Sequence, residues 1–235
     1  SLALRANYGI MSVTKGVRHR FSRPGRRGVP QMIDVIDYEA GNAPSVINAL
    51  GRLGVPCRAV SSPKELASST CIILPGVGSA RATLDSLQEL GCLDVLQRKV
   101  LGQRVPFLGI CIGLQILFDH SEEGDVKCLG WLRGRVKLFP ADKVRVPQMG
   151  WNEVRFDPAR AICNGLPERA HFYFVNSYYA VPDDPAIVVG TTDYGHEFCS
   201  MLTADNIVAT QFHIEKSGPA GLKLLFNFAS MAGDQ

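Results

Sequence analysis

The chain has 235 residues, of which 46% are hydrophobic, 20% charged and 8% aromatic, and its formal net charge is +3. This composition is typical of a globular protein and excludes collagen-like, low-complexity and wholly disordered chains. No apolar run approaches the roughly 20 residues that span a bilayer, which argues against an integral membrane protein.

The charge is distributed unevenly along the chain. Residues 1–30 contain seven basic side chains and no Asp or Glu, so the rest of the chain is mildly acidic. An Arg-rich, acid-free segment with interspersed Ser has the composition of an organelle transit peptide, and we expect residues 1–31 to be a leader directed to a plastid. A mitochondrial or cytoplasmic location, with a basic leader that targets nothing, is the alternative. Because the positive charge lies outside a folded face, nucleic-acid binding is disfavoured.

The first half of the remaining chain alternates predicted strands and helices. In chain order these are a strand at 32–37, a helix at 44–53, strands at 57–60 and 70–74, a helical segment at 80–101 interrupted near Gly91, a strand at 105–110 and a helix at 112–118. The apolar runs at 70–74 and 105–110 are typical of strands buried on both faces. This order predicts a parallel sheet with helices on both sides.

The second half is rich in predicted strands and closes with an amphipathic helix at 218–231. The strands are expected at 135–139, 153–156, 172–175, 186–191, 198–202 and 207–212. We therefore expect residues 32–235 to form one α/β domain: a mostly parallel central sheet flanked by helices, with additional antiparallel strands in the C-terminal half.

The seven cysteines are odd in number, widely spaced and free of Cys-x-x-Cys pairs. Neither a disulfide framework nor a zinc site is indicated, and a reducing compartment fits best. No metal-ligand set or nucleotide-binding loop is visible, so we expect no metal and no cofactor.

One cysteine lies in a reactive context. Gly109-Ile110-Cys111-Ile112-Gly113 sits where a buried strand ends and a helix begins, which is the nucleophile-elbow pattern. Small flanking residues permit the tight turn, and the following helix N-terminus favours a thiolate. A buried core cysteine is the alternative, because cysteine is often fully buried.

A cysteine nucleophile requires a base, and His213 is the best placed of the five histidines. It follows the last strand, and at a period of two residues Glu215 projects to the same side. The carboxylate can then orient the imidazole toward Cys111, which predicts a Cys-His-Glu triad.

The loop Leu74-Pro75-Gly76-Val77-Gly78-Ser79 follows the neighbouring buried strand. Strand ends of a doubly wound sheet converge, so we expect this loop to face Cys111 and to supply oxyanion-hole N–H groups. A plain strand-to-helix turn is the alternative.

Together these segments resemble the class I glutamine amidotransferases and, within that class, the glutaminase part of imidazole glycerol phosphate synthase. The resemblance covers about residues 32–232 and rests on six ordered segments at 36–46, 74–78, 109–115, 146–152, 173–179 and 211–217. Gly76-Val77-Gly78 and Met149-Gly150-Trp151-Asn152 point to this branch.

The resemblance implies that Cys111, His213 and Glu215 hydrolyse glutamine and that ammonia passes to a cyclase (β/α)8 partner. That partner makes imidazole glycerol phosphate and an aminoimidazole carboxamide ribonucleotide. The remaining roles that the resemblance implies are oxyanion stabilisation and glutamine binding for Gly76, Val77, Gly78, Ile112, Gln115, Ser177 and Tyr178, and cyclase contact for Met149, Trp151 and Asn152.

Three positions depart from the family pattern: Gln148 and Asn176 stand where His is usual, and Ile214 where Pro is usual. Because the triad is intact, we expect altered tuning of partner contact rather than lost chemistry. A glutaminase subunit of another synthase, a non-catalytic scaffold and a cysteine peptidase are the rival readings. The chain could be a free subunit or the N-terminal half of a fused glutaminase–cyclase.

Overall fold

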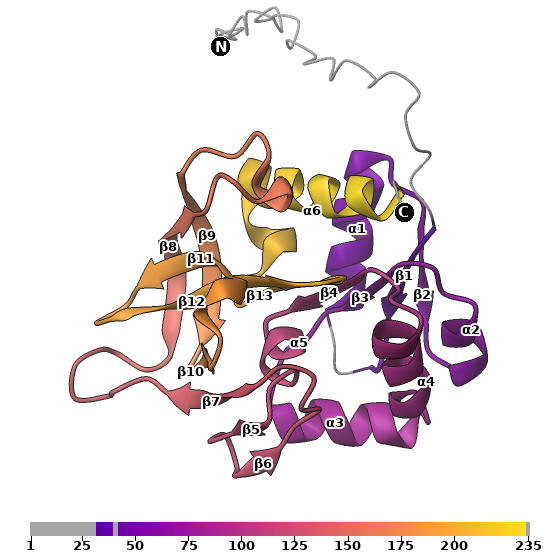
Figure 1. The fold of residues 1–235 in the computed structure, drawn as a ribbon, viewed down its shortest axis with the longest axis horizontal. Helices are drawn as coiled ribbons and strands as arrows, with labels where there is room; N and C mark the ends of the chain where they lie inside the picture. The colour runs from indigo at the N-terminus through magenta and orange to yellow at the C-terminus, as the bar shows by residue number, and fades with distance from the viewer. Residues whose placement is uncertain (1–31, 40–41, 234–235) are drawn as a thin grey trace, which may run out of the picture.

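The computed structural model describes residues 32–39 and 42–233, and the predicted leader lies outside these residues. Figure 1 shows a helix-covered sheet at one end of the molecule and a group of strands with little helical cover at the other. A single 13-stranded sheet runs through both parts.

The helix-covered part contains the parallel strands. Their order is β2–β1–β3–β4–β13, and their bounds are β1 Ile33–Ile36, β2 Cys57–Val60, β3 Ile72–Leu74, β4 Phe107–Ile110 and β13 Ile207–Thr210. Every residue of β1, β3, β4 and β13 is buried, as the continuous apolar runs predict. Because β3, β4 and β13 are parallel neighbours, their carboxyl ends meet at one edge of the sheet.

Helices cover both faces of these strands. Figure 1 shows α1 (Ala43–Leu53) and α6 (Gly218–Gly233) on one side, and α3 (Ala80–Glu89), α4 (Leu93–Gln97) and α5 (Ile112–Gln115) on the other. Local signals set the ends: Ser79 caps α3 by accepting a hydrogen bond from the Ala82 N–H, and Gly54 ends α1 at a φ of 69°.

The antiparallel part begins at β12 (Glu197–Ala204), which pairs with β13. The sheet continues through β10 (Tyr178–Pro182), β7 (Gly134–Leu138), β5 (His120–Ser121) and β6 (Val126–Lys127), and it branches through β11 (Val188–Asp193), β8 (Gln148–Phe156) and β9 (Arg169–Asn176). One pair in this part, β5 with β7, is parallel. The predicted fold class, a mostly parallel α/β sheet with antiparallel additions in the C-terminal half, is confirmed.

Several elements differ from the sequence-based expectation. The helix expected at 112–118 ends at Gln115, because the carbonyls of Ile116, Leu117 and Phe118 accept hydrogen bonds from the backbone of residues 129–132 instead of continuing the helix. The short helix α2 (Pro63–Ala67) and the strands β5, β6 and β10 were not predicted. They are too short to carry a clear periodicity.

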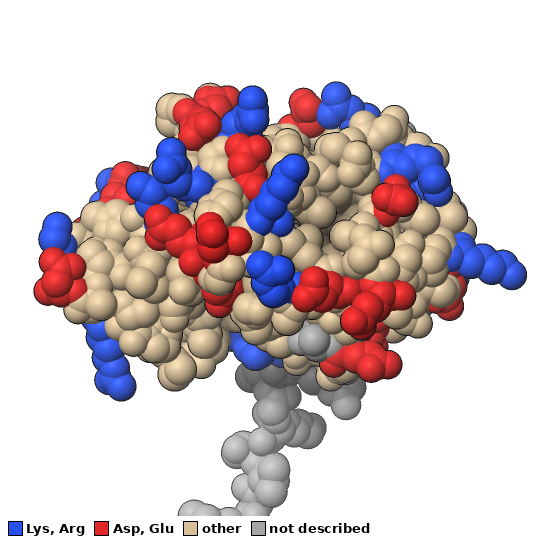
Figure 2. Space-filling view, turned by 90° about the horizontal axis from the view of Figure 1, so that it is seen from below, with Lys and Arg blue, Asp and Glu red and all other residues tan. Residues whose placement is uncertain are grey.

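Two surface properties bear on function. Within the described residues, no helix is both long and apolar enough to cross a bilayer. On the face drawn in Figure 2, basic and acidic side chains are intermixed and form no extended basic patch.

Candidate active site

Cys111 occupies a strained turn between β4 and α5. Its φ of 56° and ψ of −107° lie outside the regions that ordinary side chains favour, a conformation that costs on the order of 1–3 kcal/mol. The flanking glycines make the turn possible, because a Cβ on Gly113 would overlap the Leu74 carbonyl oxygen and one on Gly109 would overlap the Gly113 carbonyl oxygen. The elbow thus places the thiol at the carboxyl edge of the sheet.

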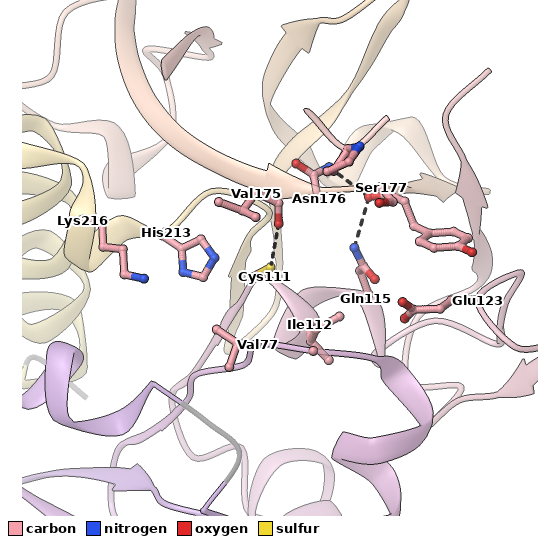
Figure 3. Close-up of a pocket in the computed structure, with 13 residues that line it drawn as sticks. Val77, Cys111, Ile112, Gln115, Glu123, Val175, Asn176, Ser177, His213 and Lys216 are labelled. Atoms are coloured by element: carbon pink, nitrogen blue, oxygen red, sulfur yellow. Dashed lines mark hydrogen bonds between the residues drawn. The ribbon is translucent and has the colours of Figure 1, made fainter. Parts of the chain in front are cut away.

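The thiol opens into a cavity of about 320 Å³ between the two parts of the sheet. Figure 3 shows Cys111 at its centre, with His213 on one side and Gln115 on the other. The cavity is lined by Val77, Gly78, Cys111, Ile112, Gln115, Glu123, Pro147, Val175, Asn176, Ser177, Tyr178, His213 and Lys216. Segments distant in sequence therefore converge on one reactive atom.

His213 and Glu215 form a buried pair beside the thiol. Nδ1 of His213 lies 2.9 Å from Oε1 of Glu215, and the two side chains are 4% and 1% exposed. Asn42 donates a further hydrogen bond to the same carboxylate oxygen at 2.7 Å. Residues 214–216 form a 3-10 turn rather than an extended strand, so the period-two reasoning was wrong although the pair it predicted is present.

The electrostatics suit proton transfer. Burial by itself lowers the pKa of His213, but its interactions with Cys111 and Glu215 outweigh burial and raise the pKa to about 10. The imidazole is therefore readily protonated next to the sulfur, as a group that must accept and donate a proton there requires. In the resting arrangement the thiol donates toward the Val175 carbonyl, 4.0 Å away.

The other cysteines are in environments that suppress reactivity. Burial raises the pKa of Cys71 and Cys199 to about 12, and that of Cys128 and Cys163 to about 11. A thiol that stays protonated at neutral pH is a poor nucleophile. Among these thiols, only Cys111 combines a histidine partner with a cavity.

The predicted oxyanion loop packs directly on the elbow. A Cβ on Gly76 would lie 2.9 Å from Cβ of Ile112, 3.1 Å from N of Gly113 and 3.2 Å from the Tyr38 hydroxyl oxygen. This close approach brings Val77 and Gly78 into the cavity wall beside Cys111. The loop therefore faces the thiol, as expected from the converging strand ends.

The family model for "Glutamine amidotransferase class-I" matches residues 34–232. The chain belongs to this family. It is 48% identical over 206 residues to imidazole glycerol phosphate synthase subunit HisH of Dehalococcoides mccartyi, an alignment covering 87% of this chain and 100% of the relative. The corresponding HisH 2 subunit of Methanococcus maripaludis is 41% identical over 202 residues, with 86% and 100% covered. Within the class, the chain thus belongs with the HisH subunits.

A solved structure supports the fold independently. A crystal structure described as glutamine amidotransferase matches this chain with a TM-score of 0.68 at 20% identity, covering 86% of this chain and 98% of the other. At that level of identity the likeness concerns the fold alone.

The substrate-binding residues predicted for this amidotransferase also reach the cavity. Gln115, Ser177 and Tyr178 line it, together with Ile112 at the elbow. Gln115 donates from Nε2 to the Tyr178 carbonyl at 3.1 Å, so part of its amide is engaged by the protein itself. Gly76 stands behind Val77 and is absent from the lining of this cavity.

Sequence reasoning missed two charged residues in the wall, Glu123 and Lys216. Figure 3 places them on opposite sides of Cys111. Glu123 accepts a hydrogen bond from the Ala80 N–H at the start of α3, which fixes its carboxylate toward the cavity. The only sequence signals were the acidic pair after Ser121 and the Lys after Glu215, neither of which is distinctive.

The residues predicted to contact a partner divide between two faces of β8. Met149 and Trp151 are two residues apart on β8 and project to the same side. Their side chains are 67% and 56% exposed, which is unusual for large apolar residues that lie next to each other. Asn152 points to the opposite face, where its amide donates to the Asp193 carbonyl and accepts from the Glu153 N–H. The structure therefore does not place the Asn152 side chain with the other two.

Two of the departures from the family pattern are neighbours. Gln148 on β8 is the register partner of Asn176 on β9, and both side chains are buried. Asn176 donates to the Tyr178 carbonyl at 2.9 Å and lines the cavity. Asn176 thus forms part of the active-site wall, and Gln148 is buried beside it on the neighbouring strand.

No group of three or more His, Cys, Asp and Glu side chains with metal-ligand geometry occurs within residues 32–39 and 42–233.

Proposed function

We propose that this amidotransferase hydrolyses the side-chain amide of glutamine and supplies the ammonia to a cyclase that makes imidazole glycerol phosphate. The observation that carries the proposal is the Cys111–His213–Glu215 arrangement at the wall of a cavity of about 320 Å³. The relatives named as HisH subunits of imidazole glycerol phosphate synthase support the choice of synthase.

In the first half of the reaction, Cys111 attacks the amide carbon of glutamine. The oxyanion that forms accepts hydrogen bonds from backbone N–H groups, for which Val77 and Ile112 are the candidates beside the sulfur. His213 donates its proton to the amide nitrogen, ammonia leaves, and a glutamyl thioester remains.

In the second half, water attacks the thioester and His213 takes a proton from it. Glutamate is released and the thiol is restored. Glu215 stabilises the imidazolium in both halves, because its carboxylate is buried against Nδ1 and accepts a hydrogen bond from Asn42.

One of the two charged wall residues, Glu123, fits the other end of glutamine. The Glu123 carboxylate is suited to the α-ammonium group, which needs an anionic acceptor in a partly buried site. Lys216, on the far side of Cys111, is instead exposed.

We propose that the cyclase docks over Met149 and Trp151. These side chains are exposed, and Met149 is the register partner of Val175, whose carbonyl faces Cys111. A partner bound over Met149 would therefore be separated from the reacting sulfur only by the Met149–Val175 pair. Large aromatic and Met side chains are also the residue types that interfaces favour.

The test uses Cys111→Ala, with Cys128→Ala as the matched control at a buried thiol outside the cavity. With the cyclase and its nucleotide substrate present, Cys111→Ala should lose glutamine-dependent synthesis while synthesis driven by added ammonium salts continues. Cys128→Ala should keep both. Glutamate release by Cys111→Ala at a rate comparable with the unmodified protein would refute the assignment.

We propose a plastid location on the composition of residues 1–31 alone. A fluorescent reporter fused behind these residues should enter plastids in plant cells. A diffuse cytosolic signal would contradict the plastid location but would not bear on the proposed glutaminase reaction.

A further inference from the structure

Gln211 is a buried polar residue next to the reacting sulfur that the reaction described above does not use. It follows β13 directly, is fully buried, and its backbone N–H donates to the Ser200 carbonyl at 2.8 Å. Its side-chain Nε2 lies 3.6 Å from Sγ of Cys111, within hydrogen-bonding distance of sulfur. A buried amide that contacts the nucleophile has a direct route to affect its reactivity.

A chain of hydrogen bonds fixes which end of the Gln211 amide faces the sulfur. The Tyr178 carbonyl can only accept, so Gln115 must present its Nε2 there, at 3.1 Å. The same Nε2 reaches the Gln211 side chain at 3.0 Å, where it must meet an acceptor, namely Oε1. Gln211 is then left with its Nε2 directed at Cys111.

We propose that Gln211 is a catalytic residue that donates a hydrogen bond to the Cys111 sulfur and favours its thiolate form, and that Gln115 acts as the positioning residue that orients it. The proposal rests on the proposed glutaminase reaction and deepens it. An N–H donor stabilises a thiolate more than a neutral thiol, because hydrogen bonds to charged groups are stronger.

Other charges around the sulfur set the background for any pH measurement. His213 and behind it Glu215 lie on one side, the Tyr38 hydroxyl lies beneath the oxyanion loop, and Glu123 and Lys216 line the same cavity. Replacing neutral Gln211 by neutral Leu leaves all of these charges in place. A change in the pH profile of such a variant therefore reports the lost donor.

The experiment measures the rate at which iodoacetamide alkylates Cys111 as a function of pH, followed by mass spectrometry of the Cys111 peptide in the full chain. In Gln211→Leu the pH midpoint of alkylation should rise by about one unit or more, while the limiting rate at high pH is kept. The kcat for glutamine should fall by about tenfold or more, with KM changed less than twofold. Gln115→Leu should shift the midpoint in the same direction by less.

Two further variants keep the test decisive. Gln211→Glu preserves the shape and can still accept from Gln115, but it places a carboxylate at the sulfur, so its midpoint should rise further than that of Gln211→Leu. Gln88→Leu on α3 is the control and should leave the profile unchanged. An unchanged alkylation profile in folded Gln211→Leu or Gln211→Glu would overturn the proposal, even if turnover fell. Because alkylation requires no glutamine, this result is independent of whether the glutaminase assignment survives.

Discussion

Replacing Gly76 by Ala tests whether the oxyanion loop must pack directly on the elbow. Gly76 has an ordinary φ, so the substitution introduces no backbone strain and acts only through the added methyl group. That methyl carbon would lie 2.9 Å from Cβ of Ile112 and 3.1 Å from N of Gly113. Neither neighbour is the flexible end of a side chain, so the loop or the elbow has to move.

The structure sets the size of the effect. Ordinary van der Waals contact between such atoms requires about 3.5–4.0 Å, so the loop must retreat by roughly 0.5–1 Å. Overpacking of this kind typically costs about 1–3 kcal/mol of stability. Displacing a catalytic donor by about 1 Å can cost on the order of 100-fold in rate, and we expect kcat for glutamine to fall by about that factor.

The matched control is Gly51→Ala in the exposed part of α1. A Cβ there has no heavy atom within 4 Å, so it adds only helix propensity and should stabilise the protein by about 0.5–1 kcal/mol. Urea unfolding midpoints and glutamate release with the cyclase present would be measured for both variants.

The two substitutions should move stability in opposite directions, and only Gly76→Ala should reduce turnover. If Gly76→Ala unfolds at the same urea concentration as the unmodified protein and retains its kcat, the close packing of loop on elbow is not required for the reaction.

The remaining predictions concern the base, the substrate and the partner. Glu215→Gln should lower kcat by at least about 100-fold, because the imidazolium loses its carboxylate. The raised pKa of His213 contributes stability that is fully present below about pH 6.5 and is lost as the pH rises through about 10. Unfolding measured from pH 6 to 10 should therefore show a smaller loss of stability in Glu215→Gln than in the unmodified protein; equal losses would contradict the coupling. Glu123→Gln should raise KM for glutamine by about tenfold with a smaller change in kcat, and an unchanged KM would remove its substrate role. Trp151→Ala should weaken cyclase binding in titration calorimetry by about tenfold or more while leaving basal glutamate release intact, and unaltered affinity would move the interface elsewhere.

Much of the fold and part of the site could be predicted from the sequence because they depend on local patterns. The apolar runs before Pro75 and before Cys111 identify strands buried on both faces, and glycine at 109 and 113 identifies a turn too tight for a side chain. The length of an apolar run and the spacing of the two glycines are properties of a few consecutive residues, so they can be read without knowing the fold. They also placed His213 with Glu215, although a 3-10 turn brings the pair together rather than the expected strand.

Only the tertiary structure decided which residues surround the sulfur. Gln211 and Glu123 reach the thiol and the cavity from β13 and from the segment after α5, and no sequence pattern pairs them with Cys111. The structure also decided the position of the Asn152 side chain, which lies on the opposite face of β8 from Trp151 because successive residues of a strand alternate between faces. A periodicity reports which face of an element is apolar, whereas contacts between separate segments, such as Gln211 with Cys111, depend on strand order and register, which are set by packing of the whole sheet.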